Sequence, residues 1–252
     1  MKAKIAVWFV GLILLPTLAL GQMDIYTNPE NLKVLPSDIS PRELSNMMKS
    51  FAMGLGVRCE TCHVGEADQP LTSFDFAADD REMKAKARSM IRMVNAINAE
   101  YISRLDDVAP SDHGARVSVR CVTCHRGVQL PKTTDEVLDD TLVADGLDAA
   151  LDKYDELRQH YYGTHSFDFD EYMLPFYAQE LAAEKKVNEA IAFLKLNVQH
   201  FPESSYTFLL LGEASVIAGD KAAAIKSYTR AAELDPDMAD FLTKKIESLN
   251  QQ

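Results

Sequence analysis

The pattern of apolar and polar residues along the chain begins with a short hydrophobic leader. Two lysines precede an apolar run over residues 5–20, which ends in the small-residue pattern Ala19-Leu20-Gly21. This order of basic, apolar and small-residue regions is typical of a secretory signal peptide. The run is about 16 residues long, shorter than the roughly 20 that span a bilayer. We therefore expect residues 1–21 to be cleaved, leaving an exported periplasmic or extracellular chain without a membrane span.

A first amphipathic helix is predicted directly after Ser40. The sequence Ser40-Pro41-Arg42-Glu43 offers an N-cap residue, a proline at the first helical position and a capping-box glutamate. Apolar residues then recur at helical spacing, and they are Leu44, Met47, Met48, Phe51, Ala52 and Leu55. Gly54 and Gly56 are expected to end this helix shortly before Cys59.

A second helix is predicted over residues 79–104. One of its faces is apolar and consists of Ala87, Met90, Val94, Ile97 and Tyr101. Met93 lies off the centre of this face, and a loop containing His113 then leads to Cys121. The chain therefore uses one plan twice, in which a helix that carries methionines precedes a pair of cysteines.

The C-terminal half contains a repeat of apolar positions. A period of 34 residues separates Pro202 from Pro236, and the alignment pairs Leu174 with Phe208, Tyr177 with Leu211, Ala178 with Gly212, Ala190 with Ala224, Leu194 with Tyr228, and Val198 with Ala232. This pattern is typical of tetratricopeptide repeats, in which two helices form a hairpin. Such stacks bind partner segments or mediate self-association, and a plain scaffold is the alternative.

Two further helices and a linker complete the predicted C-terminal half. Residues 147–158 are predicted to form half of a third repeat, and residues 239–249 a terminal capping helix. The acidic segment ahead of them is interpreted as a linker, and it contains Asp135, Glu136, Asp139, Asp140 and Asp145. His160 and His165 follow the 147–158 helix, and a role in the connecting segment is favoured over one as extra metal or haem ligands.

Composition and charge exclude several classes of protein. The chain has 252 residues, of which 47% are hydrophobic and 25% charged, as expected for an ordinary globular protein of two domains. Its formal net charge of -12 argues against nucleic acid and anionic membrane surfaces as partners. Cationic patches on other proteins are the natural docking sites for such a chain.

All four cysteines lie in two motifs with the pattern Cys-x-x-Cys-His. They are Cys59, Cys62 and His63 in the first motif, and Cys121, Cys124 and His125 in the second. This pattern is the attachment signature of c-type haem, in which two thiols bind one porphyrin and the histidine is the proximal iron ligand. A thioredoxin-like site, a four-thiolate zinc site and disulfides do not require a histidine after each pair. We therefore predict two covalently bound haem c groups.

Each iron needs a sixth ligand if it only carries electrons, and methionine or histidine usually supplies it. The first helix offers Met47 and Met48, and the second offers Met90 and Met93. His113 competes for the second iron, although a histidine beside a loop glycine is more often a surface residue.

Three segments resemble the cytochrome subunit of photosynthetic reaction centres, and they are residues 31–36, 48–59 and 91–98. The resemblance extends from about Asn31 to Val128. It implies haem units built from a helix, a turn and Cys-x-x-Cys-His, with a helix methionine as the sixth ligand. That methionine corresponds to Met48 in the first unit. In the second it corresponds to Met90 or Met93, and Met90 is preferred because it lies on the apolar face.

The predicted fold is all-α, with two haem-binding units in residues 22–134 and a tetratricopeptide-type stack of helical hairpins in residues 135–252. The predicted function is single-electron transfer between redox protein partners, without enzymatic activity. Members of the resembled family have four haem units, whereas this chain has two. Two alternatives remain, which are a dihaem peroxidase with one open iron and a self-assembling structural conduit of many haems.

Overall fold

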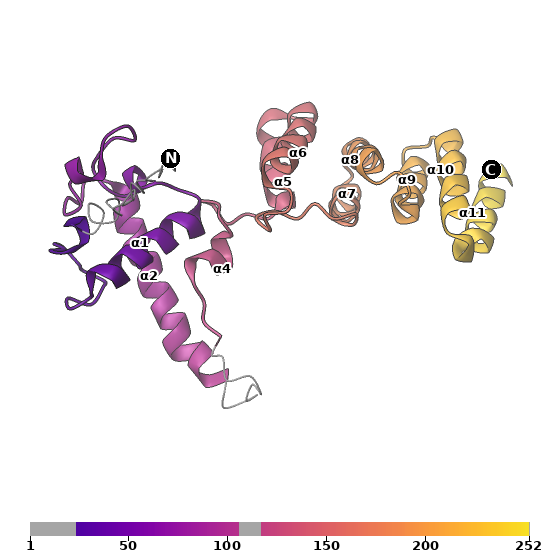
Figure 1. The fold of residues 1–252 in the computed structure, drawn as a ribbon. Coiled ribbons are helices and arrows are strands. Elements are labelled where there is room, and N and C mark those ends of the chain that lie inside the picture. Colours follow the sequence, from indigo (N-terminus) through magenta and orange to yellow (C-terminus); the bar gives the residue numbers. More distant parts are fainter. Residues whose placement is uncertain (1–23, 106–116, 252) are drawn as a thin grey trace, which may run out of the picture. The chain divides into compact units, whose positions relative to one another are not determined.

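The computed structural model describes residues 24–105 and 117–251, and within these ranges the fold is all-α, as predicted. The described residues form no strand, apart from an isolated bridge between Val64 and Asp75. They divide into two compact units (Figure 1), which we call the N-terminal unit, ending at Gln129, and the C-terminal unit, beginning at Leu130. In the described part of the chain no helix is long and apolar enough to cross a membrane. The predicted signal peptide, residues 1–21, lies outside the described residues.

The N-terminal unit combines two long helices with several short ones (Figure 1). The long helices are α1 (Pro41–Leu55) and α2 (Glu82–Ala96). The short elements are the 3-10 turns η1 (Asp24–Tyr26), η2 (Cys59–Thr61), η3 (Leu71–Ser73) and η5 (Ile102–Arg104), the π turn η4 (Ile97–Tyr101) and the helix α4 (Cys121–His125).

Helix α1 begins and ends as the sequence predicted. The Glu43 amide donates to the Ser40 hydroxyl at 3.3 Å, while the Glu43 carboxylate accepts from the Ser40 amide at 3.1 Å. This capping box satisfies two amides that the first turn would otherwise leave free. At the other end Gly56 adopts the left-handed conformation, with φ of 64°, and closes the helix.

The second predicted helix is shorter and less regular than expected. It begins at Glu82 instead of Asp79, and beyond Ala96 it widens into a π turn and then tightens into a 3-10 turn. Asp79 lies ahead of the helix, where its side chain binds Asn31 and Lys33 as well as Lys84 and Arg88 of α2. The π turn includes Asn98, whose side chain binds the segment ahead of the second cysteine motif.

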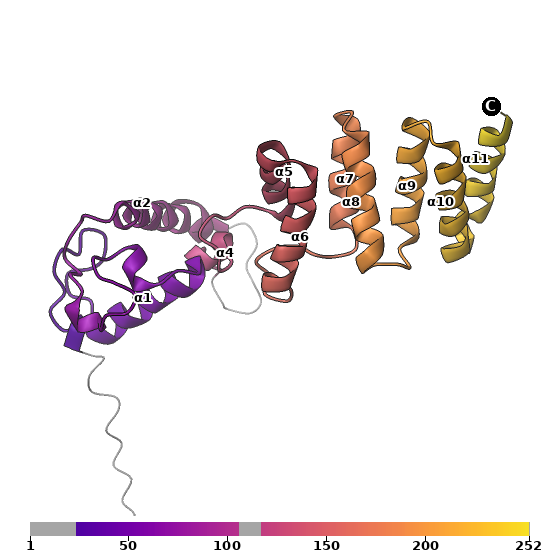
Figure 2. The ribbon, with the colours of Figure 1, turned by 90° about the horizontal axis from the view of Figure 1, so that it is seen from above.

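The C-terminal unit is a row of helical hairpins (Figure 2). Helix α5 pairs with α6, α7 with α8, and α9 with α10, and α11 covers the last hairpin. Their bounds are α5 Thr134–Asp145, α6 Leu147–Tyr161, α7 Met173–Ala183, α8 Val187–His200, α9 Ser205–Ile217, α10 Lys221–Leu234 and α11 Ala239–Gln251, with the 3-10 turn η6 at Pro236–Met238.

The interpretation of the acidic segment as a linker was wrong. It forms helix α5, which packs against α6 and completes a third hairpin. The Glu136 carboxylate accepts from the Thr133 amide at 2.8 Å. Acidic residues in the first turn of a helix are stabilised by the positive end of the helix dipole. Leu138 is fully buried in the core of this unit. The acidic residues therefore belong to the first turn of α5 and to its solvated face.

The positions that the 34-residue alignment pairs are largely buried in both later hairpins. Tyr177 and Leu211 lie in the core, as do Leu194 and Tyr228. Gly212 allows close helix contact, because a Cβ atom there would lie 2.3 Å from the Tyr228 ring. The repeated sequence pattern therefore corresponds to a repeated packing arrangement of helices α7 to α10.

Candidate functional site

The first cysteine motif forms a tight turn after α1. The amides of Cys62 and His63 both donate to the carbonyl oxygen of Cys59, at 3.2 and 2.9 Å. Both thiols are free and half-buried. Burial raises the pKa of Cys62, and the neighbouring Cys59 thiol raises it further. This turn presents two thiols and an imidazole within five residues of chain.

The imidazole of His63 lies in an aromatic environment. Its ring packs edge-on against Phe76, with 5.0 Å between ring centroids, and Phe76 stacks against Phe74. The Nδ1 atom is buried and has no hydrogen-bond partner among the described residues. Burial lowers the pKa of His63, and the nearby ammonium of Lys84 lowers it further. The ring is therefore neutral at pH 7, which is the form that coordinates a metal.

The second cysteine motif is the short helix α4, and its histidine is oriented by the following turn. Arg126 and Gly127 adopt the left-handed conformation, with φ of 51° and 85°, and reverse the chain. The Nδ1 atom of His125 then lies 3.1 Å from the Val128 carbonyl oxygen. Because a carbonyl only accepts, Nδ1 is the donor in this contact, which leaves Nε2 as the nitrogen that could bind a metal. Histidines that bind metals are commonly oriented by such a bond.

The end of α1 contacts the second motif directly. The Gly127 amide donates to the Gly54 carbonyl oxygen at 3.0 Å. A Cβ atom on Gly56 would lie 2.0 Å from the Gly127 carbonyl oxygen, and one on Gly54 would lie 3.1 Å from the Val122 amide nitrogen. Sequence analysis identified these two glycines only as helix terminators. In the structure they also allow the helix ahead of the first motif to reach the second.

Helix α2 is joined to the segment ahead of the second motif through Asn98. Its side-chain amide donates to the Val119 carbonyl oxygen at 2.8 Å, and its side-chain oxygen accepts from the Val119 amide at 2.8 Å. The Asn98 side chain thus binds both backbone polar groups of Val119, two residues before Cys121. Sequence analysis included Asn98 only as part of a resemblance, because the contact spans 21 residues of chain.

A cluster of ionic groups lies beside the first motif. Asp79 accepts from Lys33 at 2.6 Å and from Arg88 at 2.7 Å, and Lys84 lies 3.3 Å away. Lys84 is only 8% exposed and also donates to the carbonyl oxygens of Phe76, Ala77 and Ala78. Hydrogen bonds from Lys33 and Asn31 hold the pKa of Asp79 well below its usual range. Sequence analysis missed this cluster, although the acidic and basic residues at 79, 84 and 88 hinted at it.

The N-terminal unit has very little apolar core of its own, which fits it for a large apolar cofactor. Its buried hydrophobic residues among those described are Leu44, Phe74 and Val128. Several apolar side chains remain exposed, and they include Met53, Met90, Met93, Tyr101 and Val122. A helical unit of this size needs more buried apolar surface than this to fold. Free thiols, imidazoles and uncovered apolar side chains are together a donor set and a surface suited to haem.

The candidate sixth ligands differ in their surroundings. Met47 and Met48 are half-buried on α1, whereas Met90 and Met93 on α2 are each 47% exposed. Met90 is three residues after Ala87 and four before Val94, so it lies within their face, whereas Met93 lies off the centre of that face. Burial alone therefore does not distinguish Met90 from Met93.

The other histidines that were considered as ligands lie elsewhere. His113 is outside the described residues. His160 and His165 are exposed and belong to the C-terminal unit, where Nδ1 of His160 pairs with the Glu156 carbonyl oxygen at 2.8 Å. The structure thus keeps both cysteine motifs and the methionine helices in one unit and these two histidines in the other.

Comparison with known proteins identifies the family of this chain. The sequence pattern of a family described as photosynthetic reaction centre cytochrome C subunit matches residues 22–210. The match extends well beyond Val128, where the recognised resemblance ended, and reaches α9.

Individual relatives match a smaller part of the chain. This chain is 34% identical over 100 residues to "Cytochrome c-554" of Chloroflexus aurantiacus, and the match covers 40% of this chain and 21% of the relative. It is 33% identical over 108 residues to "Photosynthetic reaction center cytochrome c subunit" of Roseobacter denitrificans, covering 43% of this chain and 26% of the relative. A protein of the same name from Thermochromatium tepidum is 29% identical over 111 residues, or 43% of this chain and 22% of the relative. The matches therefore span about a quarter or less of each relative's own length.

Proposed function

Because the chain belongs to the photosynthetic reaction centre cytochrome c subunit family, we propose that it is an exported dihaem c-type cytochrome that transfers single electrons between redox proteins. One observation carries the proposal, namely that two complete Cys-x-x-Cys-His turns lie in one compact unit with little core of its own. Family membership favours electron transfer over a peroxidase-like reaction.

The residues that would hold the haems follow from the geometry of the two turns. Cys59 and Cys62 would attach one porphyrin, and Cys121 and Cys124 the other. His63 and His125 would be the proximal iron ligands, the second held by its bond to the Val128 carbonyl. Met48 and Met90 would complete the coordination, with Met47 and Met93 as alternates. Haem iron supplies the chemistry, because it gains and loses one electron without a change of bonding.

The protein itself would position the two haems, cover their faces and set the electrostatic potential around them. The contact of Gly54 with Gly127 fixes the end of α1 against the second motif. Asn98 fixes the approach to Cys121, and the exposed apolar side chains of α1, α2 and α4 provide surface for the porphyrin faces. We assign the hairpins of the C-terminal unit, which we interpret as tetratricopeptide-like repeats, to docking or assembly.

A redox titration of the purified protein tests the function. We expect two reversible one-electron steps, with low-spin absorption spectra in both oxidation states, because each iron is six-coordinate. A high-spin centre that binds hydrogen peroxide or carbon monoxide would instead support the peroxidase-like alternative. A particle that contains many copies and many haems would support the structural conduit.

Shortening the chain tests whether haem binding depends on the C-terminal unit. A chain that ends at Lys132 keeps every proposed ligand, since all of them precede the boundary after Gln129. We expect it to incorporate both haems and to retain its spectrum, while particle size or the rate of electron transfer to a partner decreases. The intact chain purified in parallel is the control. Loss of a haem from the shortened chain would show that the C-terminal unit completes a haem site.

A further inference from the structure

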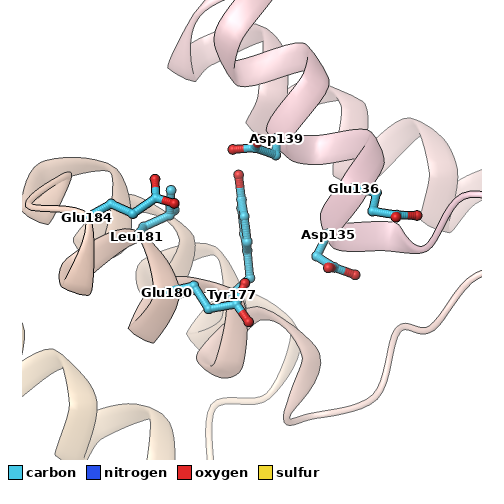
Figure 3. A pocket seen from close by; sticks show the side chains of 7 residues that line it. All are labelled: Asp135, Glu136, Asp139, Tyr177, Glu180, Leu181 and Glu184. Atoms are coloured by element: carbon cyan, nitrogen blue, oxygen red, sulfur yellow. The ribbon is translucent and has the colours of Figure 1, made fainter.

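An acidic pocket lies between helices α5 and α7 of the C-terminal unit (Figure 3). Its cavity is about 190 Å³, and its lining consists of Asp135, Glu136, Asp139, Tyr177, Glu180, Leu181 and Glu184. Five of these seven side chains are carboxylates, and none is basic. Neither the haem attachment nor the electron transfer proposed above uses this pocket.

Tyr177 gives the pocket a second, independent feature. Its side chain is only 4% exposed, and its ring stands between the two helices with the hydroxyl directed toward Asp139 (Figure 3). The hydroxyl is buried and faces Asp139, but it forms no hydrogen bond of ordinary length and angle with any described residue. Burial, together with the neighbouring carboxylates, raises the pKa of Tyr177, so the hydroxyl keeps its proton. A buried polar group without a partner is unfavourable, and a ligand with suitable donors would relieve this.

The protein's own Lys186 shows which kind of group the pocket attracts. Its ammonium lies 2.8 Å from the Glu184 carboxylate and 3.9 Å from that of Asp139. Lys186 is not among the lining residues, so it neutralises only one edge of the pocket. Among the described residues no three acidic, histidine or cysteine side chains are close enough to share a metal ion. An organic cation whose donors spread over several carboxylates therefore fits better.

Exposed aromatic side chains adjoin the pocket. Tyr172 and Phe176 on α7 are 47% and 55% exposed, and each packs against Tyr206, with ring centroids 5.9 and 6.1 Å apart. Phe176 precedes Glu180 by four residues, so both lie on one face of α7. Exposed aromatic clusters are enriched at protein interfaces. This surface suits a polypeptide better than a free ion.

We propose that the pocket between α5 and α7 binds a lysine or arginine side chain presented by a partner protein, with the aromatic cluster contacting the flanking residues. The N–H groups of the basic side chain would donate to the carboxylates of Asp139 and Glu180. They would also donate to the Tyr177 hydroxyl oxygen. The inference rests on the proposed docking role of the C-terminal unit and specifies the chemistry of its partner.

Calorimetric titration of the full haem-loaded chain with two short peptides tests this inference. One peptide contains two arginines between glycines, and the other contains citrulline, the neutral isostere, in their place. We expect the arginine peptide to bind and the citrulline peptide not to bind, because only guanidinium has the charge that the carboxylates require.

Three substitutions and a matched control locate the site. Asp139→Asn is expected to weaken binding by about tenfold or more, as for a lost hydrogen bond between charged groups. Asp140→Asn removes the same charge from the next residue of α5, which pairs with Lys132 outside the pocket, and should leave binding unchanged. Tyr177→Phe should weaken binding without lowering the melting temperature, since only an unpaired hydroxyl is lost. Lys186→Met should strengthen binding, because it removes the competing internal cation.

Equal weakening by Asp139→Asn and Asp140→Asn would overturn the inference, because it would show attraction to overall negative charge. Failure of the arginine peptide to bind would overturn it as well. In either case an intact two-haem spectrum with reversible reduction would leave the electron-transfer proposal standing. Loss of the haem spectrum would contradict that proposal instead, whatever the peptide result.

Discussion

Replacing Cys59 and Cys62 together with alanine should leave a protein that carries one covalent haem instead of two. Each proposed haem would be attached by its own pair of thiols, and the two pairs lie on separate turns of the N-terminal unit. Mass spectrometry of the denatured intact protein should show the polypeptide plus two porphyrins for the unaltered chain and plus one for the variant. The absorbance of the reduced protein should fall by about half.

The reciprocal replacement of Cys121 and Cys124 is the matched control, and it should also leave one haem. Each single-haem variant should unfold at a lower temperature than the parent, because the described core of this unit has only three buried apolar residues to replace the lost contacts. A parent chain with the mass of the bare polypeptide, or one that contains zinc in place of iron, would contradict the haem assignment.

Met48→Ala should lower the reduction potential of one haem by an amount on the order of 100 mV, because the thioether ligand favours ferrous iron. The far-red charge-transfer band of methionine-ligated ferric haem should lose the part that belongs to this centre. Met48 is half-buried and lies on the helix that leads into the first motif. Potentiometric titration with absorption spectra of both variant and parent measures the change.

Met53→Ala provides the matched control for this measurement. It removes the same side chain from the same helix, but Met53 is 78% exposed and is not a proposed ligand. We expect its potentials and spectra to equal those of the parent. If Met48→Ala behaves like Met53→Ala, then Met48 serves only packing, and Met47 or a histidine becomes the candidate ligand.

Local patterns in the sequence were enough to predict those elements whose stabilising contacts are near in sequence. The capping box at Ser40 and Glu43 spans three residues, and its helix begins where predicted. The π turn at Ile97–Tyr101 and the close contact of Gly56 with Gly127 depend on partners far along the chain. The same limit applies to Asp79, which pairs with Lys33 across 46 residues.

The acidic residues after Thr134 led to a wrong prediction of secondary structure. They suggested a solvated linker, although Leu138 and Leu142 lie among them at the spacing that one buried helix face requires. For the sites, the spacing of cysteines and histidines indicated the chemistry directly. The pocket at Tyr177 could not be predicted, because it depends on how the helices of the C-terminal unit pack.

The buried Lys84 places a fixed positive charge near His63 of the first proposed redox centre. Lys84 and Arg88 both act electrostatically on His63, and only the carboxylate of Asp79 offsets them in their ion-pair cluster. A fixed positive charge stabilises added negative charge, so Lys84 should favour the reduced state of the first centre. Because Lys84 is shielded from solvent, dissolved ions screen it weakly. This stabilisation of the reduced first centre should therefore persist from dilute to concentrated salt.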